Sequence, residues 1–150
     1  MIIGIIPVVS KEKKIYFKVD TKLIDFLKFC FGKKIKIKIL KEKSNQKLDF
    51  IVASGGNDLL RFNREKRNLK RNRLDHFYLK FAITNRISYL GICFGAQKIA
   101  NFFGSSFCKT KLHVKCTHGI KLTNKNKYFK RKSYHNYKIK ELKLPLIKEG

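Results

Sequence analysis

The sequence predicts an α/β fold with a mainly parallel sheet and helices on both of its faces. Short apolar runs alternate along the chain with segments whose apolar residues recur at helical spacing. Glycines follow two of the apolar runs, at residues 55–56 and 91–95. Strands that alternate with helices favour parallel pairing, with right-handed crossovers that pack the helices back against the sheet. Binding sites in such sheets form where loops leave the carboxyl ends of the strands.

The first strand and the first helix are predicted within the first 32 residues. Residues 2–6, IIGII, form a continuous apolar run that is typical of a strand buried on both faces. A helix is predicted after an N-cap at Asp20 or Thr21, and Gly32 stands where a C-terminal cap belongs. Its apolar residues should face the core, and we expect Cys30 among them.

Three further strands and two helices complete the expected sheet. Residues 33–40, KKIKIKIL, alternate with period two and predict a strand near a sheet edge. A buried third strand is expected within LDFIVASGGND, residues 48–58, ending at the glycine pair. The fourth strand is ISYLGIC, residues 87–93, followed by a helix over 94–103. Between the third and fourth strands we expect a helix with one apolar face, formed by Leu74, Phe77, Tyr78 and Phe81.

Composition indicates one globular domain over residues 1–150. Hydrophobic residues make up 43% of the chain, which excludes a disordered or low-complexity protein. The net charge of +26 suggests a polyanionic partner, although abundant Lys, Asn, Ile and Phe are also what an A+T-rich coding sequence imposes. The first apolar run is too short to span a bilayer and resembles no secretory signal. We therefore expect a cytoplasmic protein with reduced thiols and no membrane association.

Cys93 lies between two glycines at a predicted strand-to-helix junction and is the candidate nucleophile. A sharp turn of this kind needs small neighbours, which Gly91 and Gly95 provide. At a helix N-terminus the peptide dipoles favour the thiolate form of cysteine. The N–H of Phe94 and one N–H of residues 55–56 are placed by topology to donate to an oxyanion. The alternative is a small core cysteine; two glycine-rich strand ends favour the catalytic interpretation.

These segments resemble a known family. GICFGAQ, residues 91–97, resembles the G-x-C-x-G-x-Q nucleophile elbow of class I glutamine amidotransferases, and IVASGGND, residues 51–58, resembles their oxyanion loop. Within that superfamily the sequence is most similar to the γ-glutamyl hydrolase (peptidase C26-like) branch, which carries S-G-G-x-D and L-G-I-C-x-G-x-Q in the same order. HVKCTH (113–118) and SYHNYKI (133–139) resemble later segments of that branch. The resemblance covers most of residues 1–142 and implies a flavodoxin-like three-layer sandwich.

The resemblance implies hydrolysis of a γ-glutamyl amide, or glutamine-dependent amide transfer. Cys93 would attack the γ-carbonyl carbon and form a γ-glutamyl thioester, which water or an amine acceptor resolves. Gly56 and Phe94 would supply the oxyanion N–H groups. The residues on the substrate side would be Gly55, Asn57, Gln97 and His135. The implied partners are a small γ-glutamyl substrate or glutamine, and a synthetase or acceptor protein; no cofactor or metal is implied.

The family's general base is a histidine in an H-P-E-like triplet downstream of the segment that residues 133–139 resemble. The sequence contains no such triplet, and none of its four histidines, at 76, 113, 118 and 135, stands at that position. Loss of a base that acts as a unit with its nucleophile costs several orders of magnitude in turnover. We therefore expect a chain that lacks the last strands and is weakly active. An inactive truncated remnant is the alternative.

A zinc site and a nucleic-acid interface are the competing interpretations. Zinc ligand types occur at Cys108, His113, Cys116 and His118, but their spacing is not that of a recognised zinc motif. The basic stretches 61–73 and 125–132 contain Phe and Tyr, which could stack on bases. Without a nucleic-acid-binding motif, we expect only nonspecific, salt-sensitive polyanion binding. The basic run 61–73 is then interpreted as a solvated loop and helix face.

Overall fold

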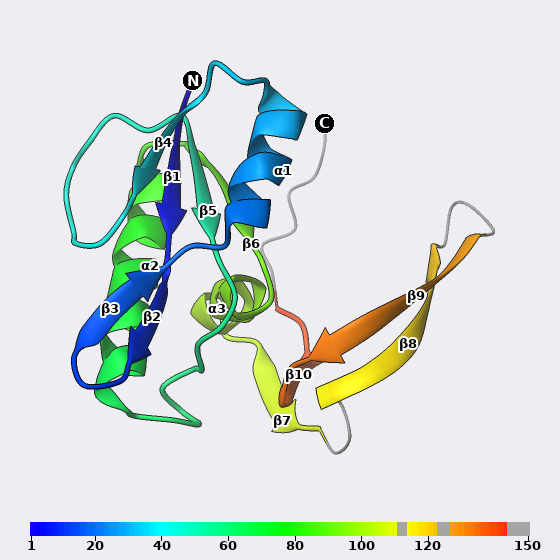
Figure 1. The fold of residues 1–150 in the computed structure, drawn as a ribbon. Helices are drawn as coiled ribbons and strands as arrows, with labels where there is room; N and C mark the ends of the chain where they lie inside the picture. Colours follow the sequence, from blue (N-terminus) through cyan, green and yellow to red (C-terminus); the bar gives the residue numbers. More distant parts are fainter. Residues whose placement is uncertain (111–113, 123–126, 144–150) are drawn as a thin grey trace. The chain divides into compact units, whose positions relative to one another are not determined.

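The computed structural model describes residues 1–110, 114–122 and 127–143 of the chain. The chain divides into two compact units, Met1–Phe102 and Phe103–Gly150, which are described separately below (Figure 1). The expectation of one domain over residues 1–150 stays a prediction.

The first unit is built on a four-stranded parallel sheet. Its strands are β1 (Ile2–Ile6), β4 (Lys36–Ile39), β5 (Phe50–Ala53) and β6 (Ser88–Gly91), in the order β4-β1-β5-β6 (Figure 1). Every pairing in this sheet is parallel, which confirms the predicted strands and the edge position of residues 36–39. Because β1 has β4 on one side and β5 on the other, the strand order reverses direction at β1. In open sheets, ligands bind beside this switch point, at the carboxyl ends of the strands.

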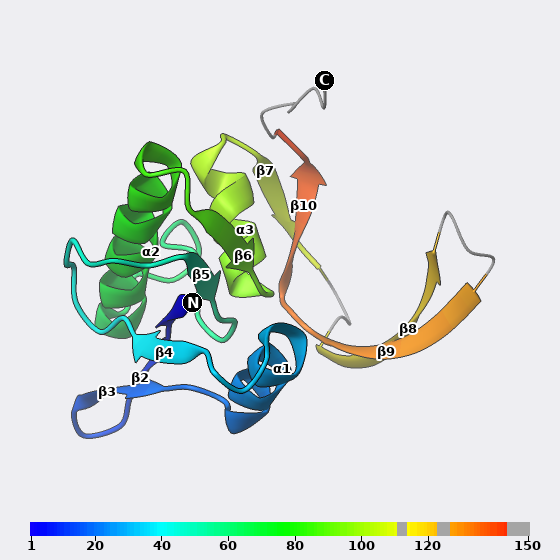
Figure 2. The ribbon, with the colours of Figure 1, turned by 90° about the horizontal axis from the view of Figure 1, so that it is seen from above.

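Helices cover both faces of this sheet. Figure 2 shows α1 (Thr21–Phe31) on one face, with α2 (Lys66–Thr84) and α3 (Phe94–Phe102) on the other. The α1 face is closed by a fully buried cluster of Ile3, Ile5, Leu27 and Val52. The α2 face is closed by Ile6, Leu40, Leu48, Ile51, Ala53, Leu74, Tyr78 and Ala82. The three-layer α/β fold predicted from the sequence is confirmed.

Helix α1 has the predicted ends but not all of the predicted buried face. The Asp20 side chain accepts a hydrogen bond from the Lys22 N–H at 2.9 Å, as an N-cap should. Cys30, however, is exposed, so the prediction that it faces the core is wrong. At about 100° per residue, Phe31 lies about 40° from the direction of Leu27, whereas Cys30 lies about 60° from it on the other side. The last turn therefore contacts the sheet through Phe31, whose ring centre is 5.3 Å from that of Phe50.

Helix α2 carries the expected apolar face and an unexpected polar one. Leu74 and Tyr78 are buried, and the rings of Phe77 and Phe81 pack against the same cluster, as predicted. The interpretation of residues 61–73 as a solvated loop and helix face holds for the exposed Lys66, Lys70 and Arg73 but is wrong for Asn68, Arg71 and Asn72, which are buried. The buried polar residues of α2 are Asn68, Arg71, Asn72 and Asp75. They recur at helical spacing, so one stripe of α2 faces the protein along most of its length.

A hairpin that the sequence analysis did not predict follows the first strand. Strands β2 (Val8–Lys11) and β3 (Ile15–Lys18) pair antiparallel, with residues 12–14 forming the turn. The signal was present in the sequence, since two short apolar runs flank the charged turn KEKK. The hairpin matters for the site because Val8 packs against Gly56, in the loop that follows β5.

The second unit consists of two antiparallel pairs. Strand β7 (Ser106–Lys109) pairs with β10 (Tyr137–Glu141), and β8 (Val114–Leu122) pairs with β9 (Lys127–Tyr134). The Ser105 hydroxyl contacts the backbone of Lys143, accepting from its N–H at 2.8 Å. Of the predicted zinc ligands, His113 lies outside the described residues, and the described part of the chain holds no cluster of three or more ligating side chains.

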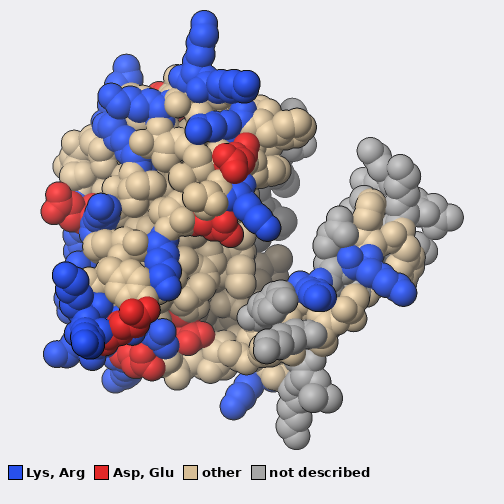
Figure 3. All heavy atoms as spheres, in the orientation of Figure 1, with Lys and Arg blue, Asp and Glu red and all other residues tan. Residues whose placement is uncertain are grey.

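Basic side chains are dispersed over one face of the molecule (Figure 3). On the face that Figure 3 shows, Lys and Arg are spread across the molecule, with several Asp and Glu between them. None of the described helices combines the length and the apolarity that a bilayer crossing requires.

Candidate active site

Cys93 occupies the turn between β6 and α3. Strand β6 ends at Gly91, and α3 begins at Phe94, so only two residues connect them. Cys93 has a φ of 53°, a left-handed conformation that costs a non-glycine residue roughly 1–2 kcal/mol. Its side chain is exposed and forms no disulfide. Such strain at an accessible thiol is typical of functional sites, where the surrounding packing maintains it.

The packing that maintains this turn comes from two glycines. A Cβ atom on Gly91 would lie 2.5 Å from the carbonyl carbon of Gly95, and a Cβ on Gly95 would overlap the carbonyl oxygen of Ala53. The first turn of α3 therefore lies directly against the ends of β5 and β6. Hydrogen bonds close the turn, from the Ile92 N–H to the Ala53 carbonyl and from the Gly95 N–H to the Ile92 carbonyl, both at 2.9 Å. No larger side chain fits at either glycine.

The loop after β5 lies against Cys93. A Cβ on Gly55 would stand 3.1 Å from the Cys93 Cβ and 3.8 Å from its Sγ, so the loop backbone and the thiol are immediate neighbours. Gly56 has a φ of 90°, a region that L side chains rarely adopt. The two glycine-rich strand ends that the sequence analysis singled out are thus brought together at one edge of the sheet.

Arg71 binds this loop through hydrogen bonds to its backbone carbonyls. Its guanidinium is fully buried and donates to the Ser54 carbonyl at 2.5 Å, to the Pro7 carbonyl at 2.8 Å and to the Gly55 carbonyl at 3.5 Å. In a trans peptide the C=O and the N–H point in opposite directions. With the Gly55 carbonyl turned toward Arg71, the N–H of Gly56 points away from it. Arg71 therefore helps to set the direction of the N–H that the sequence analysis assigns to the oxyanion.

The same guanidinium also contacts the residue after Cys93. Its central carbon lies 5.0 Å from the centre of the Phe94 ring, and the Phe94 side chain is buried. Phe94 is the first residue of α3, where backbone N–H groups have no acceptor within the helix. Both N–H groups predicted for the oxyanion, those of Gly56 and Phe94, thus belong to segments that touch Arg71.

Asp75 completes this buried cluster. Its Oδ2 accepts from Arg71 Nε at 2.6 Å, and both side chains are fully buried. Burial raises the pKa of Asp75, because the loss of hydration outweighs the attraction of Arg71. The Tyr89 hydroxyl lies 3.5 Å from Asp75 Oδ1, and burial together with this carboxylate raises the pKa of Tyr89.

Comparison with known proteins identifies the family of this chain. The family model of class I glutamine amidotransferases matches residues 33–148. The chain belongs to the class I glutamine amidotransferases.

A curated relative and a solved structure show what this amidotransferase chain is similar to. The γ-glutamyl-CDP-amidate hydrolase of Campylobacter jejuni is 31% identical over 97 residues, which cover 65% of this chain and 47% of the relative. The match therefore spans about half of the relative's length. The crystal structure of a candidate GMP synthase subunit from Thermoplasma acidophilum superposes with a TM-score of 0.63 and 21% identity, covering 95% of this chain and 68% of that one. This likeness supports the flavodoxin-like fold.

The remaining predicted site residues of this amidotransferase chain differ in their surroundings. Gln97 is partly buried in the first turn of α3, and its N–H donates to the Cys93 carbonyl at 3.0 Å. The Asn57 amide is used within the protein: its Oδ1 accepts from the Val9 N–H and its Nδ2 donates to the Val9 carbonyl. His135 lies between β9 and β10 in the second unit. The substrate roles of Asn57, Gln97 and His135 stay predictions.

Proposed function

We propose that this chain cleaves a γ-glutamyl amide bond with Cys93 as its nucleophile. The observation that carries the proposal is the position of Cys93: an exposed thiol at a strained turn, beside the loop of Gly55 and before the first N–H groups of α3. The Campylobacter relative, whose name gives a γ-glutamyl amidate as its substrate, supports the same bond.

The reaction proceeds by acyl transfer to sulfur. The Cys93 thiolate attacks the γ-carbonyl carbon, and the N–H groups of Gly56 and Phe94 donate to the oxyanion that forms. Collapse of this intermediate breaks the C–N bond, and the leaving nitrogen takes the proton that the Cys93 thiol gave up and departs as the free amine. Water then attacks the thioester carbon and the C–S bond breaks; of the two protons of water, one returns to sulfur and one goes to solvent as the γ-carboxylate is released.

These steps need a group that accepts a proton near Cys93. Within residues 1–102, no histidine stands beside the Cys93 turn in the sequence. His76 is the only histidine in that range, and it lines a hollow beside α2. Acylation of an activated substrate needs less help from a base than hydrolysis of the thioester does. The proposal therefore predicts that Cys93 reacts readily with activated analogues, whereas turnover is slow.

A diazoketone analogue of glutamine tests the proposal. When its glutamyl group binds at the active site, the analogue alkylates the thiol that is positioned to attack the γ-carbon. Peptide mass spectrometry then locates the adduct. We expect one adduct per chain, on Cys93, formed more slowly in the presence of excess glutamine. Cys93→Ala should abolish it.

Cys30 provides the matched control, because it is also exposed and lies in the same unit. Cys30→Ala should leave labelling unchanged, and a nonspecific alkylator should modify both thiols. Equal labelling of Cys30 and Cys93 by the glutamine analogue, or labelling that glutamine does not slow, would contradict the assignment. Labelling without release of ammonia from glutamine would indicate a nucleophile that lacks its base.

A further inference from the structure

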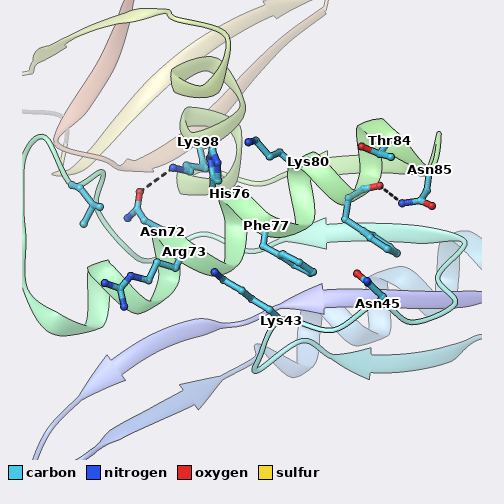
Figure 4. Close-up of a pocket in the computed structure, with 12 residues that line it drawn as sticks. Lys43, Asn45, Asn72, Arg73, His76, Phe77, Lys80, Thr84, Asn85 and Lys98 are labelled. Atoms are coloured by element: carbon cyan, nitrogen blue, oxygen red, sulfur yellow. Dashed lines mark hydrogen bonds between the residues drawn. The ribbon is translucent and has the colours of Figure 1, made fainter.

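A hollow of about 820 Å³ lies beside α2, in the first unit (Figure 4). Its walls come from α2, from the segment between β4 and β5, from Leu60 in the connection between β5 and α2, and from the Lys98 side chain of α3. Cys93, Gly55 and Gly56 do not line it. Its size falls within the range of small-molecule sites, about 300–1,000 Å³.

The charge of this hollow is one-sided. Its cations are Lys43, Arg73, Lys80 and Lys98, and among the described residues that line it there is no Asp or Glu. His76 lies among these cations: burial lowers its pKa, and the charges of Lys98, Lys80 and Lys43 lower it further. A ligand with one carboxylate would leave most of this charge uncompensated, so the hollow suits an anion of several charges.

Lys98 is the most enclosed of these cations. The residue is only 8% exposed, although an ammonium group has three N–H donors that need partners. Among the described residues its Nζ makes one hydrogen bond, to Asn72 Oδ1 at 3.4 Å, and Figure 4 shows the two groups facing each other. Burial lowers the pKa of Lys98, in part offset by the charge of Asp75. An anion entering the hollow would supply the missing acceptors.

The rest of the lining is apolar or carries uncharged amides. Phe77, Phe81 and Leu60 all line it, and the two rings lie nearly parallel, 12° apart. Asn45, Asn72 and Asn85 line the same hollow; the Asn72 Nδ2 already donates to the Asp58 and Asn68 carbonyls, and the Asn85 Nδ2 donates to the Phe81 carbonyl. Aromatic faces bind flat rings, and carboxamides bind the polar edges of such rings.

We propose that this hollow binds an organic polyphosphate that carries a flat ring, the chemistry of a nucleoside triphosphate, with Lys98 as an anchor for its phosphates. The site is separate from the Cys93 turn, so it stands independently of the proposed amide hydrolysis. Lys98 follows Cys93 by five residues, however, and the two flank the first turn and a half of α3. Phosphate binding would therefore fix the helix whose N-terminus adjoins the thiol.

A small ligand fits better than a nucleic acid. The Lys98 ammonium lies inside the hollow, where the phosphates of a rigid duplex cannot follow, whereas a free triphosphate can enter. Nucleic acid would instead contact the exposed lysines, and its affinity would fall steeply with salt.

Isothermal titration of the full chain with ATP at physiological ionic strength tests the proposal. We expect one ATP per chain, weaker binding of inorganic triphosphate, and no measurable binding of adenosine alone. Lys98→Met should weaken ATP binding roughly tenfold or more, as expected for loss of one charge-assisted contact. Lys28→Met, the same change at an exposed position of α1, should leave it unaltered.

The folded state of each variant is checked by its melting temperature. If Lys98→Met does not fold, Lys80→Met, at an exposed position of α2 in the same hollow, replaces it with the same expected direction. The proposal is wrong if the Lys28 and Lys98 variants lose equal affinity. It is also wrong if inorganic triphosphate binds as tightly as ATP, or if single-stranded RNA displaces ATP at equal phosphate concentration, because general basic charge would then explain the binding.

Discussion

Arg71 and Phe94 meet beneath the candidate active site, with the guanidinium carbon 5.0 Å from the ring centre. The nitrogens of the same guanidinium bind the Ser54 and Gly55 carbonyls of the loop after β5. One buried side chain therefore contacts both segments that carry the N–H groups assigned to the oxyanion.

Removal of Arg71 should destabilise the protein strongly. Arg71→Met leaves Asp75 buried without its partner, which costs about 3–5 kcal/mol of unfolding free energy. Arg71→Met combined with Asp75→Leu should be less destabilising than Arg71→Met alone, because no buried charge remains. Urea unfolding of the two single variants and the double variant measures this coupling; additive effects would mean that the two side chains act independently.

Gly95→Ala should destabilise the protein, although alanine usually stabilises a helix. The added Cβ overlaps the Ala53 carbonyl, and overpacking of this kind costs about 1–3 kcal/mol. Gly32→Ala is the control, since Gly32 has a φ of 85° and no neighbour within 4 Å of the added Cβ, so that only backbone strain is tested. Chemical denaturation compares the two. A stable Gly95→Ala protein would mean that α3 can move away from the sheet.

Cys93→Gly should be more stable than Cys93→Ala by about 1 kcal/mol. A glycine relieves the left-handed backbone of position 93, whereas alanine retains the strain. The same pair of substitutions at Cys30 should give the opposite order, because Cys30 lies inside helix α1, where glycine is unfavourable. Denaturant midpoints of the four variants test this reversal.

Lys98→Met should stabilise the ligand-free protein at neutral pH. Burial lowers the pKa of Lys98 in the folded state, so the unfolded chain binds its proton more tightly. Stability of the wild type is therefore reduced below the folded-state pKa and recovers as pH rises toward the ordinary lysine value. The melting-temperature advantage of Lys98→Met should shrink at alkaline pH. An advantage that stays constant with pH would assign the effect to packing.

The strands and the nucleophile turn could be predicted because their signals are local. Continuous apolar runs predict the buried strands, and the glycines around Cys93 reflect a contact that only glycine permits. Cys30 was misplaced because its apolar neighbours define a stripe only to within about one residue, and the last turn of α1 contacts the sheet through Phe31.

Arg71 was missed because its own segment is strongly basic, and charged residues are usually solvated. A signal did exist: Asn68, Arg71, Asn72 and Asp75 continue, at helical spacing, the stripe that Leu74 and Tyr78 form. What the spacing could not indicate is the partner, because the carbonyls that Arg71 binds belong to residues 7 and 54–55, brought there by the sheet.

The shape of the turn at residue 93 is imposed by main-chain contacts of its glycine neighbours, and the sulfur takes no part in them. Any side chain at that position would be presented in the same direction, whatever its chemical character. The conformation of the turn and the chemistry of the side chain at position 93 are in this sense independent. Another residue can therefore replace Cys93, removing the thiol chemistry, while the backbone turn keeps its conformation.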